Sequence, residues 1–410
     1  ALALVTGMAQ AAPSGVEVVS GSGHITQGGA TTTIEQSSER LSLKWQGFDI
    51  GAGETVNFHQ PSRRALAINR ILDPHGTEIL GRLNANGQVW LINPNGLLFG
   101  RSAQVNVGGL VASTLDDVHR DGEQVSFSGE GTGRIVNRGT LTAAEGGYIA
   151  LLGNRVSNQG VIAARLGTVA LGGGSAATLT FEGNRLLHLE VDRSTLDNLA
   201  ENGGLIRADG GRVLMSAGAR ESVLASVVNN TGVVQAQTVE EHNGTITLLA
   251  GMQAGTTKVG GTLDASAPEG GDSGFIETSG AHVKVGEEAK VTTLAPGGES
   301  GTWLIDPTDY TVGPGGDMSG AQVESALAGG NLTIQSSDGS GGTDGDINVN
   351  DAVSWGANTL TLTAANDINI NAVMSATGSA SLAMTPGGSV KVALSGSGFT
   401  GRVDFNSTGS

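Results

Sequence analysis

The chain contains no cysteine, few aromatic side chains and few charges. The absence of cysteine excludes a disulfide framework, a thiol nucleophile and a cysteine-ligated zinc site. Aromatic residues make up 3% of the chain and charged residues 15%, so the large rings that supply much of the buried area of a rounded core are scarce. No apolar run approaches the roughly 20 residues that a membrane-spanning helix requires.

Positive charge is also scarce, and it is distributed unevenly. The chain carries 22 Lys and Arg against 39 Asp and Glu, a net charge of −17. Residues 1–220 hold 17 basic and 19 acidic side chains, whereas residues 221–410 hold 5 and 20. Nucleic-acid binding needs clustered Lys and Arg, and an anionic membrane repels acidic chains. The composition therefore predicts no nucleic-acid partner. The acidic half favours solubility over binding of a divalent ion or a cationic partner.

Glycine is abundant, at 67 of 410 residues, and short internal repeats accompany it. Asn137–Ala143 recurs 21 residues later as Asn158–Ala164. Asp346–Asn350 recurs, again 21 residues later, as Asp367–Asn371. Looser copies of the first repeat begin at Gly204, Thr231 and Gly261.

These repeats predict an all-β fold, a parallel β-helix. Within a repeat, segments with period-two alternation such as Thr359–Thr363 are typical of strands, and Gly and Asn suit the tight corners between them. Coils stacked about 4.8 Å apart would bury a continuous aliphatic column. We expect about seventeen to nineteen coils and a rod of about 80–90 Å. A β-sandwich is the alternative, and it would need more aromatics and hairpins.

Two segments depart from the strand pattern. Residues 319–328 read SGAQVESALA and are closed by Gly329 and Gly330, which predicts a short capped helix. Residues 194–201 resemble it more weakly. We expect both segments to lie outside the coils as insertions.

Several motifs follow one another in the first half of the chain. They are NFHQPS at residues 57–62, AINR at 67–70 and WLINPNG at 90–96. In this order they closely resemble the secretion domain of two-partner-secretion exoproteins, the family of filamentous haemagglutinin and related large bacterial adhesins. The resemblance runs from about residue 15 to about residue 192. It implies a right-handed parallel β-helix with an N-terminal cap, recognised by the periplasmic binding domains of a dedicated outer-membrane transporter.

The resemblance also assigns the residues that the transporter recognises. The four residues of the secretion motif are Asn93, Pro94, Asn95 and Gly96. From the residues alone this is a turn, because Pro fixes φ at its second position and Asn-Gly tolerates positive φ. The turn could nucleate the first coils, be read by the transporter, or do both. The three residues of a secondary secretion motif are Asn57, Gln60 and Pro61.

The chain divides into three expected parts. Residues 1–14 contain Ala9-Gln10-Ala11 shortly before a proline, as in the tail of a secretory signal peptide. Residues 15–192 form the secretion domain, and residues 193–410 form a β-helical shaft with the helical insertion near 319–328. The resemblance implies export through the periplasm to the cell surface or the exterior, as the front of a longer molecule.

The sequence offers little catalytic chemistry. It lacks Gly-x-Ser-x-Gly, His-Glu-x-x-His and phosphate-loop motifs. Asp338, Asp344 and Asp346 share a glycine-rich loop, but their spacing does not fit a calcium-binding repeat. We therefore predict no catalytic residue, no cofactor and no metal.

The resemblance favours a secreted adhesin that attaches to cells, surfaces or a biofilm exopolysaccharide. The alternative is the delivery stalk of a contact-dependent growth-inhibition toxin. A haem-acquisition exoprotein is a third hypothesis.

Overall fold

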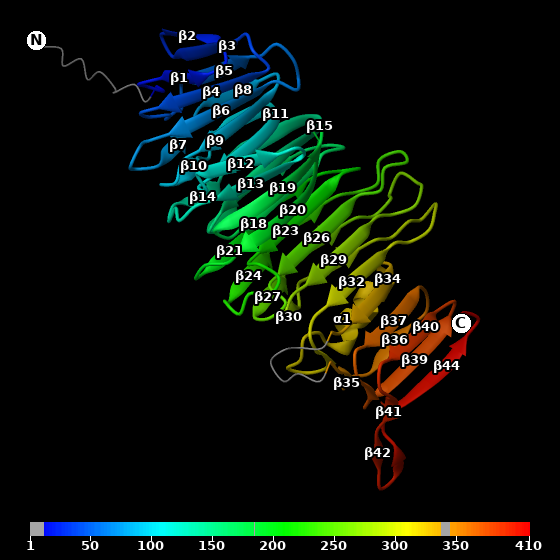
Figure 1. Cartoon of the computed structure of the whole chain (residues 1–410). Helices are drawn as coiled ribbons and strands as arrows, with labels where there is room; N and C mark the ends of the chain where they lie inside the picture. Colours follow the sequence, from blue (N-terminus) through cyan, green and yellow to red (C-terminus); the bar gives the residue numbers. More distant parts are fainter. Residues whose placement is uncertain (1–11, 184, 338–344) are drawn as a thin grey trace, which may run out of the picture.

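The computed structural model describes residues 12–183, 185–337 and 345–410. The signal-peptide pattern at residues 9–11 and the aspartates Asp338 and Asp344 lie outside these ranges. The described chain winds into an elongated stack of coils, with the earliest strands at one end and the latest at the other (Figure 1). It is a parallel β-helix, which confirms the predicted fold class.

Each coil has three sides. On the first side, successive coils pair in parallel from the first strand to the last. The first side consists of β4 (Arg40–Trp45), β6 (Leu66–Ile71), β9 (Gln88–Ile92), the later parts of β11 (Gln104–Ser113) and β15 (Thr140–Gly153), β18 (Thr168–Gly173), β23 (Arg212–Ala217), β26 (Thr245–Ala250), β29 (Phe275–Ser279), β32 (Thr302–Asp306), β34 (Asn331–Gln335), β37 (Thr359–Ala364) and β40 (Ser381–Pro386).

The second and third sides are shorter. The second side consists of β7 (Thr77–Ile79), β10 (Leu97–Phe99), β14 (Arg134–Asn137), β16 (Arg155–Asn158), β21 (Asn198–Asn202), β24 (Ser226–Asn230), β27 (Gly255–Val259), β30 (His282–Val285), β33 (Tyr310–Val312), β35 (Ile347–Val349), β38 (Ile368–Ile370) and β41 (Val390–Val392). The third side consists of β3 (Thr31–Gln36), β5 (Thr55–His59), β8 (Arg82–Ala85), the early parts of β11 and β15, β17 (Val161–Ala163), β22 (Leu205–Arg207), β25 (Val233–Gln235), β28 (Thr262–Asp264), β31 (Lys290–Thr292), α1 (Gly320–Ala328), β36 (Val353–Trp355), β39 (Val373–Gly378) and β44 (Arg402–Ser407). The parallel pairing of the second side is interrupted between β30 and β33, and that of the third side is interrupted at α1.

Other strands cap or extend the stack. At the N-terminal end, β1 (Glu17–Ser20) pairs antiparallel with β4, and β2 (Gly23–Gly28) pairs antiparallel with β3. A four-stranded sheet, here called the side sheet, is formed by β12 (Asp117–Asp121), β13 (Gln124–Ser128), β19 (Ala176–Glu182) and β20 (Arg185–Arg193). The hairpin β42 (Leu394–Ser395) and β43 (Gly398–Phe399) projects near the other end (Figure 1).

The coils are fewer and longer than the 21-residue repeats predict. In the described ranges, thirteen strands stack along the first side, from β4 to β40. Tyr148 and its partner Thr168 are 20 residues apart, but Thr168 and its partner Arg212 are 44 apart. The prediction of seventeen to nineteen coils was therefore wrong, because loops and the side sheet lengthen many coils.

Aliphatic columns fill the interior. On the third side the paired residues Val105, Leu141, Ile162, Ile206, Val234 and Leu263 are all fully buried. Each branched side chain therefore packs on a similar one in the next coil, so small aliphatic residues suffice for this part of the core.

Glycine columns mark two corners where the backbones of adjacent coils approach closely. A Cβ on Gly167 would lie 2.0 Å from the Gly147 carbonyl oxygen, and a Cβ on Gly211 would lie 2.0 Å from that of Gly167. No side chain fits at these separations. The second column contains Gly139, Gly160, Gly204, Gly232 and Gly261.

A buried asparagine ladder precedes this second column. The side-chain Nδ2 of Asn137 donates to Oδ1 of Asn158, that of Asn158 to Asn202, and that of Asn202 to Asn230, each at 2.8 Å. Asn137 Oδ1 also accepts from the N–H of Gly139 at 3.1 Å. The Asn-x-Gly repeat in the sequence is the signature of this corner.

The side sheet covers part of the first side and forms a second core that contains four aromatic residues. Trp90, Phe127, Tyr148 and Phe181 pack there, with ring centroids 5.2 to 6.5 Å apart in the contacting pairs. Trp90 Nε1 donates to the Tyr148 hydroxyl at 2.9 Å, which donates in turn to Gln88 Oε1 at 2.6 Å.

The two expected helices have different outcomes. The helix near 319–328 is confirmed as α1, with Ser319 and Gln322 forming its capping box. It does not lie outside the coils: it takes the third-side position between β31 and β36 and buries Val323 and Leu327 in the main core. Residues 194–201 are not helical, because they lead into the paired strand β21.

Replacing Gly167 by Ala tests the glycine columns. The added methyl would collide with backbone, which cannot move without opening the coil stack, so we expect a loss of about 1–3 kcal/mol. Urea unfolding followed by circular dichroism measures it. Gly53→Ala is the control, because a Cβ there meets nothing within 4 Å. Equal unfolding midpoints for both variants would contradict the steric argument.

Candidate functional site

The four residues predicted to form the secretion motif lie at the corner between β9 and β10. Asn93 is fully buried. Its carbonyl accepts from the Gly96 N–H at 3.1 Å, and its Oδ1 accepts from the Asn95 N–H at 2.9 Å. Its Nδ2 donates to Thr77 Oγ1 at 3.0 Å. The predicted turn is present, and the Asn93 side chain holds it from inside.

Neighbouring coils enclose this corner on both sides. The Thr77 N–H donates to the Gly96 carbonyl at 3.0 Å, and the Gly133 N–H donates to that of Pro94 at 3.2 Å. Gly96 has a φ of +118°, whereas Asn95 does not share the positive φ expected for it. Asn93 and Gly96 are buried, Pro94 is half-buried, and Asn95 is exposed. The folded corner therefore presents only Pro94 and Asn95 to a partner.

The secondary motif lies at a different corner, between β5 and β6. Gln60 is buried, and its Nε2 donates to Gln36 Oε1 at 3.0 Å and to the Gln88 carbonyl at 3.1 Å. Its Oε1 accepts from the Gly87 N–H at 2.9 Å. Pro61 is exposed. Gln60 thus joins three coils, and the fold does not bring it to the turn at 93–96.

Asn57, the remaining motif residue, belongs to a surface row of amides on the third side. Asn84 Nδ2 donates to Asn57 Oδ1 at 3.0 Å, and Asn106 Nδ2 to Asn84 Oδ1 at 3.4 Å. The row borders an open hollow of about 500 Å³ beside His59. The sequence prediction missed Asn84 and Asn106, since their shared register emerges only from coils of unequal length.

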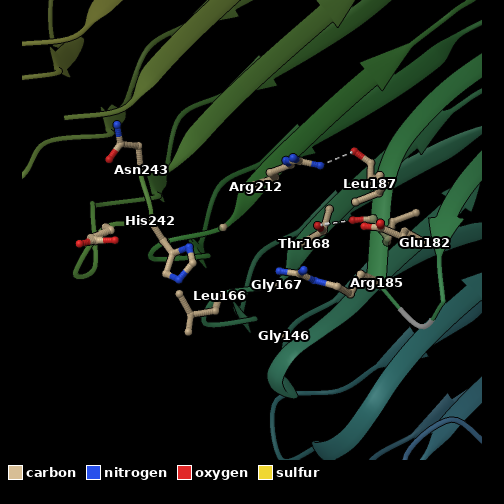
Figure 2. Close-up of a pocket in the computed structure, with 14 residues that line it drawn as sticks. Gly146, Leu166, Gly167, Thr168, Glu182, Arg185, Leu187, Arg212, His242 and Asn243 are labelled. Carbon is tan, nitrogen blue, oxygen red and sulfur yellow. Dashed lines mark hydrogen bonds between the residues drawn. The ribbon is translucent and has the colours of Figure 1, made fainter. Parts of the chain in front are cut away.

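A groove of about 300 Å³ lies beside the side sheet (Figure 2). Its other wall is formed by the corners at which the chain passes from the third side of a coil to the first side of the next. Arg185 extends toward the part of the groove that holds His242 and Leu166. Arg212 Nη1 donates to the Leu187 carbonyl at 3.2 Å. Glu182 also lines the groove. Charges of both signs line it, so it favours no ligand of one sign.

A second hollow, of about 230 Å³, contains a carboxylate without a partner. Oδ1 of Asp306 is buried and accepts no hydrogen bond in the described structure. Burial raises the pKa of Asp306 to about 6, and nearby Glu277 raises it further while Arg220 opposes the shift.

The described residues provide no cluster of three or more His, Asp or Glu side chains arranged to hold a metal. Asp346, the described member of the glycine-rich aspartate loop, accepts from Asn366 Nδ2 at 2.9 Å and from the Asp367 N–H at 3.0 Å. The Asp346 carboxylate therefore forms hydrogen bonds to the next coil.

Comparison with known families identifies the chain. A family model described as the TPS secretion domain, for two-partner secretion, matches residues 9–263. The chain belongs to this family. TPS exoproteins are exported across the outer membrane to the cell surface or the extracellular space, and this is the destination of the present chain. No helix in the described residues is long and apolar enough to cross a membrane.

Two curated relatives of this TPS protein are heme/hemopexin-binding proteins of Haemophilus influenzae. One is 29% identical over 255 residues, covering 58% of this chain and 27% of the relative. The other is 32% identical over 244 residues, covering 53% and 26%. The chain thus spans about a quarter of the length of these relatives.

The crystal structure of the HMW1 secretion domain from H. influenzae shares the fold. Its TM-score is 0.58 at 22% identity, and the match covers 92% of this chain and 99% of that one.

Replacing Asp306 by Asn tests the unpaired carboxylate. The folded pKa near 6 exceeds the ordinary 3.8, so the folded protein holds the proton more tightly, and its stability falls as pH rises from about 4 to about 6. Asp306→Asn should therefore be more stable than the wild type at pH 7.5, by about 1 kcal/mol after allowance for solvent screening.

The measurement is urea unfolding at pH 4 and pH 7.5. The gain in stability of Asp306→Asn over the wild type should vanish at pH 4. The exposed control variant Asp121→Asn should show no pH-dependent change in stability relative to the wild type. A D306N gain that is the same at both pH values would show that the charge is not its cause.

Proposed function

We propose that this TPS exoprotein is an adhesin without catalytic activity, exported by a partner outer-membrane transporter. Its role is attachment to cells, surfaces or a biofilm exopolysaccharide. The family match over residues 9–263 is the observation that carries the export route. We assign residues 15–192 to the secretion domain and 193–410 to the shaft, the first part of which the family match also covers.

The burial of the secretion motif supports recognition before folding. The folded corner hides Asn93 and Gly96 and leaves only Pro94 and Asn95 accessible. A transporter that reads all four residues must therefore meet them before the neighbouring coils close over the turn. We propose that the periplasmic binding domains of the transporter recognise these residues.

Rows of side-chain amides on the shaft support a binding role toward carbohydrate. Asn369 Nδ2 donates to Asn348 Oδ1 at 2.9 Å, and Asn371 Nδ2 to Asn350 Oδ1 at 2.7 Å. Each amide keeps donor or acceptor capacity for a second partner. Such rows, repeated at the coil spacing, suit the hydroxyl groups of an extended polysaccharide.

The names of the curated relatives favour a second candidate, the binding of heme or hemopexin. The delivery stalk of a growth-inhibition toxin is a further alternative. Purified chain is mixed with immobilised exopolysaccharide, with hemopexin and with heme. Retention on the polysaccharide alone would support the adhesin, and retention on hemopexin or heme alone would replace it with the second candidate.

The double substitution Asn95→Val and Gly96→Val tests the secretion motif. Valine is strained at the positive φ of Gly96, by about 1–2 kcal/mol, and it removes the polar group at Asn95. We expect a block in secretion with degradation in the periplasm when the variant is expressed with its transporter. The same variant refolded from denaturant should remain largely β-helical by circular dichroism, since solenoid coils stabilise mainly their neighbours.

Gly122→Val is the matched control, because Gly122 also has a positive φ but lies in an exposed turn outside the motif. It should be secreted. Normal export of the double variant would refute recognition through this turn. Failure of both export and refolding would assign the turn to folding instead.

A further inference from the structure

A third hollow, of about 250 Å³, lies where the side sheet meets the first coils. Three arginines line it, each from a different element. Arg40 begins β4, Arg64 lies in the corner before β6, and Arg120 lies in β12 of the side sheet. All three side chains reach solvent.

These arginines lack counter-ions. In the described ranges, no ion pair involves Arg40, Arg64 or Arg120. Arg120 Nε donates to the Gly122 carbonyl at 3.2 Å, which leaves its terminal nitrogens available. Partial burial lowers the pKa of Arg120, and the positive charge of Arg40 lowers it further. Like charges thus face one another across the hollow.

Among the described residues that line the hollow, Glu39 alone carries a carboxylate. Its Oε2 accepts from Ser62 Oγ at 2.9 Å and forms no ion pair with the arginines. The carboxylate of Glu39 is therefore held by the corner that carries Ser62.

Buried side chains, most of them apolar, lie beneath the hollow. Trp90 and Phe181 are buried beneath it as part of the second core. Gln88 Nε2 donates to the Arg64 carbonyl at 3.0 Å, while Gln88 Oε1 accepts from the Tyr148 hydroxyl at 2.6 Å. The Arg64 N–H donates to Ser62 Oγ at 3.2 Å. The corner that carries Arg64 is thus held in place before any ligand binds.

We propose that this hollow binds a tetrahedral oxyanion, a phosphate or sulfate group, between Arg40, Arg64 and Arg120. Guanidinium groups bind such anions with paired, charge-assisted hydrogen bonds. Three unpaired guanidiniums in a chain of net charge −17 suit a dianion better than a single carboxylate. The anion is either a free ion or an ester group on a saccharide, and the chemistry of recognition is the same.

The test is calorimetric titration of the purified chain at constant ionic strength with inorganic phosphate, inorganic sulfate and acetate. Phosphate and sulfate should bind saturably and more tightly than acetate. The double variant R40Q/R120Q should lose about tenfold or more in affinity for both dianions. Arg63→Gln is the matched control, since Arg63 adjoins Arg64 but does not line the hollow.

Circular dichroism establishes that each variant is folded. Unsaturable binding, equal binding of acetate, or unchanged affinity in R40Q/R120Q would overturn the proposal. Glucose 6-phosphate and glucose 6-sulfate then distinguish the sources. Tighter binding than the inorganic ion identifies an ester-bearing saccharide, whereas weaker or equal binding identifies the free ion.

Discussion

The structure depends on one constraint: successive coils are separated by the distance between two hydrogen-bonded strands. At about 4.8 Å, each position in a coil meets its counterpart in the next. Where that counterpart is a carbonyl, as at Gly167 over Gly147, only glycine fits. Where it is a buried amide, as at Asn137 and Asn158, the same side chain serves as donor and acceptor in turn. The glycine-rich, aromatic-poor composition is the consequence of this repeated contact.

The same constraint explains where the surface departs from regularity. Because strand pairing holds the sides of the coils in register, additional residues are inserted at the corners. The side sheet is the largest of these insertions. Its strands border the groove at Arg185, the hollow at Asp306 and the arginine hollow at Arg120. Hollows with unpaired charge thus arise where irregular chain lies against a regular stack, and ligand-binding candidates gather there.

Sequence repeats predicted the β-helix, and a capping pattern closed by two glycines predicted the helix at 319–328, because both depend on local patterns. The number of coils and the position of α1 within the third side depend on loop lengths, and local sequence patterns do not predict these lengths. The turn at 93–96 was likewise predictable, but the burial of Asn93 depends on Thr77 and Ser113 in adjacent coils. The arginine hollow joins three distant segments of the chain, and nothing in the spacing of Arg40, Arg64 and Arg120 signals their approach.

Folding buries two of the four residues of the turn at 93–96, which implies an order of events in the proposed export route. In a solenoid, each coil is stabilised chiefly by contact with its neighbours. The corner at 93–96 closes only when residues 73–77 and 131–134 pack on either side of it. In the described part of the chain no coil precedes β3 and β4, and the antiparallel strands β1 and β2 pair with them at this end of the stack. Once the first coils form, each further coil can pair with the exposed backbone N–H and carbonyl groups of the coil before it. In the proposed route, release of the motif and growth of the stack would therefore be one event, because the packing that buries Asn93 and Gly96 also forms the edge on which the next coil pairs.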